Sequence, residues 1–473
     1  MNKKLLMFLG LLLNLSITIY AQEDTYEDPS IGFGLNAMDS ASVLKIPFGY
    51  TRIGDQQFIG FRVQPEISIW KIGVGLDIPF LFNLDSLQDG KFQLREDEYT
   101  GGVGLLRMFR YIRYGFKKRD KVYAKIGDMT GEYIGFGGLV NNYSNAPNFE
   151  KRKVGLSLDV RPVPYAGLEG IYSDFSTTSM LALRPYTRPF ATTEIPIVET
   201  IEAGLIIVTD NDRSSDSTAF VRSGMNAWGV DIGATIINTS FLQLVGYMQY
   251  SRLRQVDTDT LRSALAAEAL LNPNKADLIS NYKSAGGFSI GANVKLNLIA
   301  NIFNLDARLE RLWYGNYYRP QFFNAVYEIN KDRAILNLAS TERITGTYGV
   351  LTGTLLNKLR ISGGLLFPDN ISAENPALIH LGADASEIIP KWILTANYIK
   401  GDLANLGEAF ILDERSLLTA RMAYRVASIF AVGVDYRWTF ARIAEEDGTE
   451  NVEATNYVMP YFGLYVPLNL NIN

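Results

Sequence analysis

Apolar and polar residues alternate along many stretches of this chain, each about 10–14 residues long. In Gly287–Leu298, Phe288, Ile290 and every second residue after them are apolar, whereas Ser289, Asn293 and the other intervening residues are small or polar. Successive side chains on a strand point to opposite faces, so each stretch has one apolar and one polar face. The same alternation recurs at 59–69, 72–82, 154–161, 418–426 and 430–440. The pattern predicts amphipathic β-strands.

The connections between these stretches are alternately short and long. The tight ones fall at 238–239, 300–301, 357 and 427–428, and the long ones at 210–222, 253–284, 314–344, 401–414 and 441–456. A soluble sandwich has shorter strands and no reason for this order. We therefore predict an all-β fold, a transmembrane antiparallel up-and-down β-barrel of about 16–20 strands with short periplasmic turns and long outer loops.

One segment fits two interpretations. In Tyr99–Tyr114, Leu105, Met108, Phe109 and Ile112 have helical spacing, so this segment is either a strand or a short amphipathic helix inside or beneath the barrel. The choice changes the predicted number of strands.

The N-terminus has the pattern of a secretory signal peptide. Lys3 and Lys4 precede an apolar run from Leu5 to Ala21, and Ala21 is a small residue at the expected cleavage position. We predict a signal peptide at 1–21, a periplasmic segment at 22–42 and the barrel at 43–473. No later apolar run approaches the roughly 18–20 residues of a membrane helix, although 47% of residues are hydrophobic.

Composition excludes several kinds of chemistry. The chain has no cysteine, which removes disulfides, thiolate metal sites and cysteine nucleophiles. Its formal net charge is −5 and it has no basic stripe, which argues against binding to nucleic acid. Asp210, Asp212 and Asp216 suggest calcium ligands, but their spacing lacks the glycine and final glutamate of an EF-hand, so a solvated turn is favoured. We expect no metal and no cofactor.

Charged residues are spread over the faces that we assign to the lumen. A charge on the lipid face costs about 2–4 kcal/mol near the membrane midplane, so the alternation directs these side chains inward. They either line a pore that selects by charge and size or fill a closed barrel as an ion-paired network; we favour the pore. The lumen-lining candidates are Arg62, Glu66, Asp77, Asp159, Arg161, Asp231, Lys295, Asp306, Arg308, Glu310, Arg421, Arg425, Asp435 and Arg437.

Two outer loops stand out. In Leu253–Ser284, Asp257 or Thr258 is placed to cap a helix that ends near Leu271, and a second short helix fits Lys275–Tyr282. This loop either folds inward as a constriction or packs over the mouth. The other loop, Tyr314–Ile344, is rich in aromatic residues, so it packs on the barrel or contacts a partner.

The mature chain resembles porin-like outer-membrane β-barrels in its architecture. The signal ending at Ala21 and the long outer loops are similar to those of Bacteroidota. Within this class, the chain resembles one of the uncharacterised barrel families, with a candidate motif at 111–115, 124–127, 135–138 and 142–145. We interpret the glycines of 135–138 as strand glycines, which mark bends or close packing. The C-terminal Asn471-Ile472-Asn473 departs from the terminal aromatic residue that such barrels usually carry.

The resulting expectation is a non-enzymatic outer-membrane channel for passive diffusion of small polar solutes. Its expected partners are outer-membrane lipid and lipopolysaccharide, and the barrel assembly machinery during insertion. The alternative is a barrel scaffold or subunit of an envelope assembly, secretion or uptake complex that docks through the 314–344 loop. A third, distant interpretation is a hydrolase or acyltransferase with the single histidine, His380, as its base, but no partner motif accompanies that residue.

Overall fold

A computed structural model describes the barrel part of the chain. It covers residues 43–467, with gaps at 47, 54–55, 85, 87–89, 92, 96–107, 146–152, 177–178, 212–222, 300–301, 325–326, 357, 373–375, 386–387, 413–415, 428–429, 445–449 and 465. The predicted signal peptide (1–21), the segment 22–42, and Asp212 and Asp216 lie outside the described residues.

Within the described residues, 23 strand segments form one antiparallel sheet. The segments are β1 Val43–Lys45, β2 Phe48–Ile53, β3 Gln56–Ile69, β4 Ile72–Leu76, β5 Ile78–Asn83, β6 Phe109–Tyr114, β7 Val122–Gly127, β8 Gly155–Val163, β9 Ala166–Tyr172, β10 Leu181–Thr187, β11 Glu202–Asp210, β12 Met225–Asn238, β13 Leu242–Gln255, β14 Ala285–Ile299, β15 Phe303–Tyr314, β16 Ile344–Leu355, β17 Leu359–Pro368, β18 Ala377–Asp384, β19 Trp392–Leu403, β20 Ser416–Ala427, β21 Phe430–Ala444, β22 Glu450–Leu464 and β23 Val466–Pro467.

Three pairs of segments continue one another along a single strand. β1 and β2 pair with β3 in one register, β4 and β5 also share a register on β3, and β22 and β23 pair with β2 and β1. These continuations reduce the 23 segments to twenty strands. The described part of the chain therefore confirms the predicted fold, with a strand number inside the predicted range.

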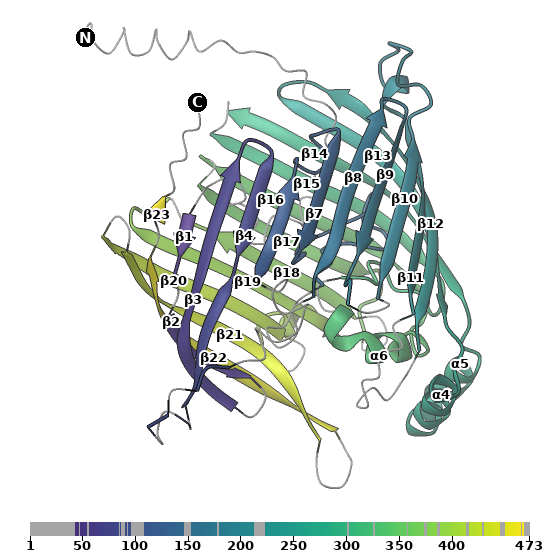
Figure 1. The fold of residues 1–473 in the computed structure, drawn as a ribbon. Coiled ribbons are helices and arrows are strands. Elements are labelled where there is room, and N and C mark those ends of the chain that lie inside the picture. Colours follow the sequence, from purple (N-terminus) through teal and green to yellow (C-terminus); the bar gives the residue numbers. More distant parts are fainter. Residues whose placement is uncertain are drawn as a thin grey trace, which may run out of the picture.

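The sheet closes on itself where the two ends of the chain meet. Val43 on β1 pairs with Pro467 on β23, and Phe48 on β2 pairs with Phe462 on β22. Figure 1 shows the purple first strands beside the yellow last strands. Closure pairs the backbone N–H and C=O groups of the first and last strands, so no strand edge of the described sheet is left open. A β-sheet can cross a lipid bilayer only when its edges are closed in this way.

The doubtful segment near Tyr114 is a strand where it is described. β6 (Phe109–Tyr114) pairs with β4 on one side and with β7 on the other. Its burial alternates, with Tyr111 and Arg113 buried and Ile112 and Tyr114 exposed. The backbone hydrogen bonds of the barrel wall thus outweigh the helical spacing of the apolar residues.

The wall is apolar outside and polar inside. On β12, Trp228, Val230 and Ile232 are 44%, 44% and 42% exposed, whereas Asp231 between them is buried. On β14 the apolar Phe288 and Ile290 are likewise exposed, while Ser289 is buried. A continuous exterior of this kind matches the hydrocarbon of a membrane, and the wall is that of an outer-membrane β-barrel.

Helices α4 Asp259–Leu271, α5 Ala276–Ser280 and α6 Tyr327–Leu338 lie at the end of the barrel that carries the long connections (Figure 1). The short helices η4 Pro273–Lys275 and η5 Leu406–Glu408 belong to connections at the same end, whereas η3 Val198–Thr200 joins β10 to β11 at the opposite end. Among the described residues, no helix combines the length and apolarity needed to cross a membrane.

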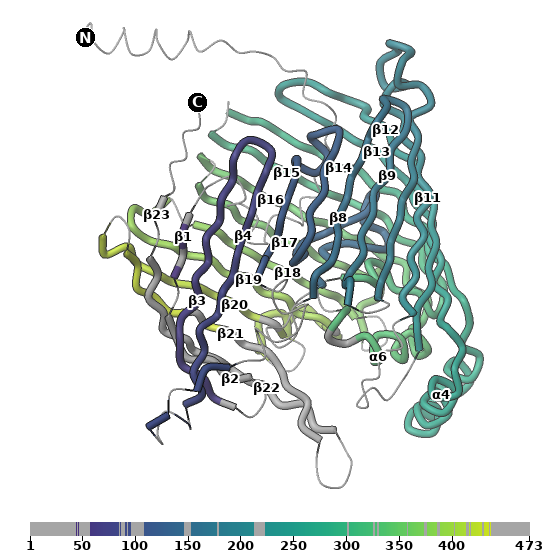
Figure 2. Tube along the Cα trace, viewed as in Figure 1, coloured from purple at the N-terminus to yellow at the C-terminus, as the bar shows by residue number. Residues whose placement is uncertain are grey.

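The predicted helix in the 253–284 loop is confirmed, but it does not enter the lumen. Thr258 caps α4 by accepting a hydrogen bond from the Leu261 backbone N–H at 3.2 Å. Figure 2 shows α4 standing beside the barrel mouth, and Leu270 and Leu271 at its end are 82% and 77% exposed. The helix of this loop lies beside the mouth and outside the lumen, so the constriction interpretation of this loop is wrong.

Two other long connections fill part of the lumen. They are residues 128–145, which follow β7, and residues 315–343, which include α6 and join β15 to β16. Residues 131–141 are all buried, and the aromatic residues of the second loop lie in the same hydrophobic cluster. We call these two loops together the plug. The aromatic side chains that suggested a docking surface on 314–344 are therefore buried inside the barrel: Tyr317, Tyr318, Phe322, Phe323 and Tyr327.

Candidate functional site

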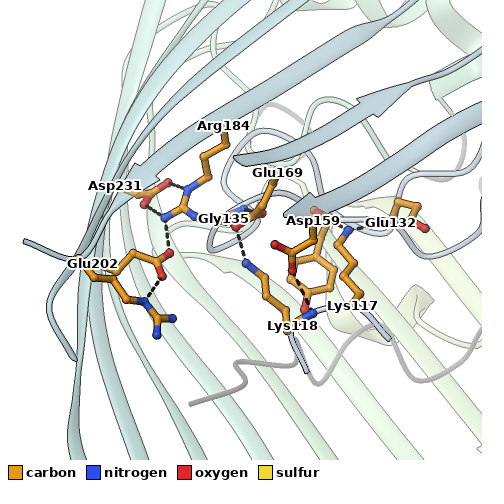
Figure 3. A network of polar contacts seen from close by, with 11 residues as sticks. Lys117, Lys118, Glu132, Gly135, Asp159, Glu169, Arg184, Glu202 and Asp231 are labelled. Carbon is orange, nitrogen blue, oxygen red and sulfur yellow. Dashed lines mark hydrogen bonds and ion pairs between the residues drawn. The ribbon is translucent and has the colours of Figure 1, made fainter. Parts of the chain in front are cut away.

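A fully buried arginine is the centre of the inner wall on the side that faces the plug. Arg184 on β10 donates from Nε to Asp231 Oδ2 at 2.8 Å and from Nη1 to Glu169 Oε1 at 2.7 Å. Its Nη2 lies 2.8 Å from Glu202 Oε1. Figure 3 shows the guanidinium between these carboxylates, which come from three different strands. A guanidinium paired in this way fixes the relative position of β9, β11 and β12.

The register of the strands creates the space for this group. Arg184 pairs with Glu169 across β9 and β10, and Gly204 pairs with Asp231 across β11 and β12. A Cβ atom at Gly204 would lie 2.3 Å from Arg184 Nε. The glycine is thus required because the guanidinium occupies the volume of a side chain.

Two lysines of the turn between β6 and β7 extend the network toward the plug. Lys118 Nζ pairs with Glu169, and the Lys118 backbone N–H donates to Asp159 Oδ2 at 2.9 Å. Lys117 Nζ binds Glu132 Oε2 at 2.7 Å and the Tyr133 carbonyl oxygen at 2.8 Å. Since Glu132 and Tyr133 belong to the first plug loop, Lys117 ties that loop to the wall (Figure 3).

The tip of the first plug loop is Gly135–Gly138, and it contacts the wall directly. The Gly135 backbone N–H donates to Glu169 Oε2 at 2.9 Å, and Arg308 Nη2 donates to the Phe136 carbonyl oxygen at 2.7 Å. Gly135 and Gly137 have φ angles of 59° and 77°, which favour glycine. The interpretation of 135–138 as strand glycines is therefore wrong: they form the turn of an inward loop.

The two plug loops are joined by backbone hydrogen bonds. Val140 and Phe323 form a parallel bridge, with Asn141 N–H donating to the Phe323 oxygen at 3.1 Å and Phe323 N–H donating to the Leu139 oxygen at 3.1 Å. The Gln321 N–H also donates to the Gly138 oxygen at 2.9 Å. The loops consequently form one structural unit.

Helix α6 attaches this unit to the wall at the long-loop end. Asp210 at the end of β11 accepts a hydrogen bond from the Tyr327 hydroxyl at 2.8 Å and pairs with Lys331 Nζ at 2.7 Å. Glu328 pairs with Lys153 and accepts from the Tyr143 hydroxyl. Asp210, which the sequence offered as a calcium ligand, instead anchors α6. Within the described ranges, no group of three His, Asp or Glu side chains is arranged to hold a metal ion.

Half of the predicted lumen residues take part in ion pairs or hydrogen bonds of the closed wall. Arg62 pairs with Asp77 at 2.8 Å, Glu66 pairs with Arg110, and Arg308 pairs with Glu310 at 2.7 Å. Asp159 and Asp231 belong to the network around Arg184 and Lys118. All of these except Arg62 and Arg110 are buried.

The other predicted residues for which the structure describes the side chain are half-buried. Lys295 and Asp306 are directly opposite each other on β14 and β15, and Arg161 is on β8. Arg421 and Arg425 are on β20, and Asp435 on β21 is the register partner of Arg421. Of Asp435 and Arg437, only the backbone is described.

The half-buried face continues onto β17 and β18. Arg360 is opposite Asp384, and Asp384 is opposite Thr395, which in turn is opposite Arg421. Cations and an anion thus stand at one level of the sheet. We call the half-buried residues Arg360, Asp384, Arg421 and Arg425 the charged wall. His380 is a half-buried neighbour on β18 that faces Gly364.

Sequence reasoning missed Arg184, Glu202, Lys117, Lys118 and Glu132. Arg184 shares its face of β10 with Ala182 and Tyr186, so alternation within 181–187 was the available signal. The lysines lie in a tight turn and Glu132 lies in a loop, where no periodicity exists to assign a side chain to a face.

We predict that the seating of the first plug loop depends on the charge of Glu132. Burial raises the pKa of this carboxyl, but the charges of Lys117 and Lys125 and hydrogen bonds from Lys117 and Ser157 outweigh burial and hold the pKa below its usual 4.5. The stabilisation is therefore complete above pH 4.5 and is lost as the pH falls through the lowered value. Hydrogen-exchange protection of residues 132–138 should decrease only in acid.

The matched variant for this prediction is Glu132→Gln. It should show reduced protection of the loop already at neutral pH and little further loss on acidification. Equal protection of both proteins at neutral pH would contradict the prediction.

No family model matches this sequence. No curated protein matches it either. Solved structures with a similar fold include the outer membrane protein OprD from Pseudomonas aeruginosa, at 10% identity and a TM-score of 0.33, with 91% of this chain and 95% of that chain covered. Wzi, an outer membrane protein involved in group 1 capsule assembly in Escherichia coli and a carbohydrate-binding β-barrel, has 12% identity and a TM-score of 0.35, with coverages of 92% and 86%. The ferric-catecholate import receptor Fiu from E. coli K12 has 8% identity and a TM-score of 0.36, with coverages of 90% and 82%. The likeness to these proteins extends to the fold alone.

Proposed function

We propose that this chain is an outer-membrane channel for passive diffusion of small polar solutes, and that they pass between the plug and the charged wall. The observation that carries this proposal is the asymmetry of the inner surface. On β9, β10 and β12 the inward charges are buried against the plug, whereas Arg360, Asp384 and Arg421 remain half-buried on the other side. A half-buried charge in a barrel of twenty strands is accessible to water in the lumen.

Mixed charges suit a channel for polar solutes without strong ion selectivity. Arginines and an aspartate share one level of the sheet, so neither sign dominates the local potential. The plug reduces the cross-section of the lumen and would thereby exclude large solutes. The predicted lumen residues Lys295, Asp306 and Asp435 extend the same lining in this proposal, together with Arg437 and Arg161. Lipid, lipopolysaccharide and the barrel assembly machinery are the proposed partners in the membrane.

Planar bilayer recordings test this function. The purified chain should give discrete conductance steps, and the double substitution Arg421→Glu with Arg425→Glu should shift the reversal potential in a salt gradient toward cation preference, because it replaces lumen cations with anions. Arg262→Glu, on the exposed α4, is a single charge reversal outside the lumen and should leave the reversal potential unchanged. Absence of steps after verified insertion, or an unchanged reversal potential in the double variant, would overturn the proposal.

A further inference from the structure

The tip of the first plug loop sits in a socket on the inner wall. The Phe136 ring stacks on Tyr247 of β13, with ring centroids 4.6 Å apart and an angle of 1° between the planes. Gly233 on β12 leaves the room for this ring, since a Cβ there would lie 2.4 Å from it. Val245 completes the apolar part of the socket. A flat ring between an aromatic face and a glycine is the arrangement of a ligand in an aromatic binding site.

The socket also binds the backbone on both sides of the ring. Glu169 accepts the Gly135 N–H at 2.9 Å, and Arg308 donates to the Phe136 carbonyl oxygen at 2.7 Å. The wall therefore recognises three features of the tip: one amide N–H, one aromatic ring and one carbonyl oxygen. Any short peptide with an aromatic residue presents the same three features.

Other wall residues hold the recognition groups in place. Glu169 is fixed by Arg184 and Lys118, and Arg308 is fixed by Glu310, which also accepts a hydrogen bond from the Tyr247 hydroxyl. Because these supporting contacts do not involve the plug, we expect them to hold Glu169 and Arg308 in place when the tip leaves. Preorganisation of this kind favours ligand binding.

A small pocket adjoins the socket beside the tip. It is lined by Gly135, Phe136 and Gly233 together with Lys118, Glu202 and Thr235. The residues on β11, β12 and β13 that line it lie toward the short-turn end of the barrel.

We propose that the socket is a binding site for short peptides that contain an aromatic residue, and that the plug tip occupies it as an internal competitor. This inference rests on the proposed function in one respect: the lumen must be open enough to admit the peptide. Binding to the socket displaces Gly135–Gly138 and opens the path along the β9–β13 side of the lumen.

The test measures binding to protein in detergent, independently of conductance. The variant Phe136→Ala removes the ring of the competitor, and the probe is N-acetyl-Gly-Phe-Gly-amide, measured by isothermal titration calorimetry. The phenylalanine probe should bind this variant at least about tenfold more tightly than the unsubstituted chain. In the variant, the ring of the probe no longer competes with the Phe136 ring for the socket. N-acetyl-Gly-Ala-Gly-amide is the control probe and should bind weakly to both proteins.

A second substitution blocks the socket itself. Phe136→Ala combined with Gly233→Leu should lose the gain, because the leucine fills the volume of the ring. Folding of each variant is checked by its heat-modifiable mobility on a gel. Equal binding of the two probes by folded Phe136→Ala, or unchanged binding after Gly233→Leu, would overturn the proposal.

The unsubstituted chain offers a measurement that does not depend on these variants. Saturating phenylalanine peptide should increase hydrogen exchange at residues 133–138, since it displaces the tip; no increase would overturn the proposal. Peptide binding with no conductance in bilayers would disprove the diffusion channel and leave the binding site intact. Conductance without peptide binding would disprove the binding site and leave the diffusion channel intact.

Discussion

Removing the inward hairpin of the plug should raise the single-channel conductance several-fold. The hairpin is residues 133–142, and its base is closed by backbone hydrogen bonds between Glu132 and Tyr143 of 3.0 and 2.8 Å. An Asn-Gly turn is suited to join these two positions, because it matches the geometry of a two-residue hairpin. The deletion removes the loop that covers Arg184, Arg308 and Glu169, so the lumen widens on that side.

The measurement is the size of conductance steps in planar bilayers at one salt concentration. The control is the double substitution Leu270→Ser with Leu271→Ser, which alters exposed positions on α4 outside the lumen and should leave the step size unchanged. An unchanged step size in the deletion variant would mean that ions do not pass beside the plug, which contradicts the proposed path.

The barrel wall was predictable because its physical constraint is local. Lipid excludes charge from every second position of a strand, so the alternation in Gly287–Leu298 and its equivalents identified the strands and their inward faces. Helix α4 was predictable for a similar reason, since Thr258 and the Asn272-Pro273 pair are local start and stop signals. Such signals require no knowledge of distant residues.

The plug was not predictable because its constraints come from distant parts of the chain. Gly135–Gly138 folds inward because Gly233 leaves space for Phe136 and because Glu169 and Arg308 accept and donate its backbone hydrogen bonds. These partners are dispersed over three strands. When the pairing of those strands is unknown, the glycines of 135–138 are equally consistent with a bend in a strand. The aromatic residues of 315–343 are then equally consistent with a docking surface.

The charged network shows the same limit. Alternation predicts that Asp231 lies on the inner face, but its partner Arg184 and the carboxylate Glu202 are known only from the pairing of β10, β11 and β12. The sequence distinguishes inward from outward charges. It does not distinguish a charge that lines a path from one that holds the wall to the plug.

Substituting Arg184 by alanine should destabilise the barrel by about 3–5 kcal/mol, because removal of one partner leaves buried charges uncompensated. Arg184 is fully buried and contacts Glu169, Glu202 and Asp231, so three carboxylates lose their guanidinium at once. The measurement is the free energy of unfolding by urea of the protein in lipid vesicles. Arg188→Ala is the matched control, since Arg188 is more exposed than Arg184 and pairs with Glu202; its effect should be about 1 kcal/mol or less.

A double substitution separates the ion pairs from packing. Asp231→Asn introduced beside Arg184→Ala removes one of the uncompensated carboxylates at almost constant volume, so the double variant should be more stable than Arg184→Ala alone. If the loss came only from the cavity left by the arginine side chain, Asp231→Asn would add a further loss or change nothing. The sign of that difference therefore decides whether charge compensation or packing holds β10 between β9 and the strands that carry Glu202 and Asp231.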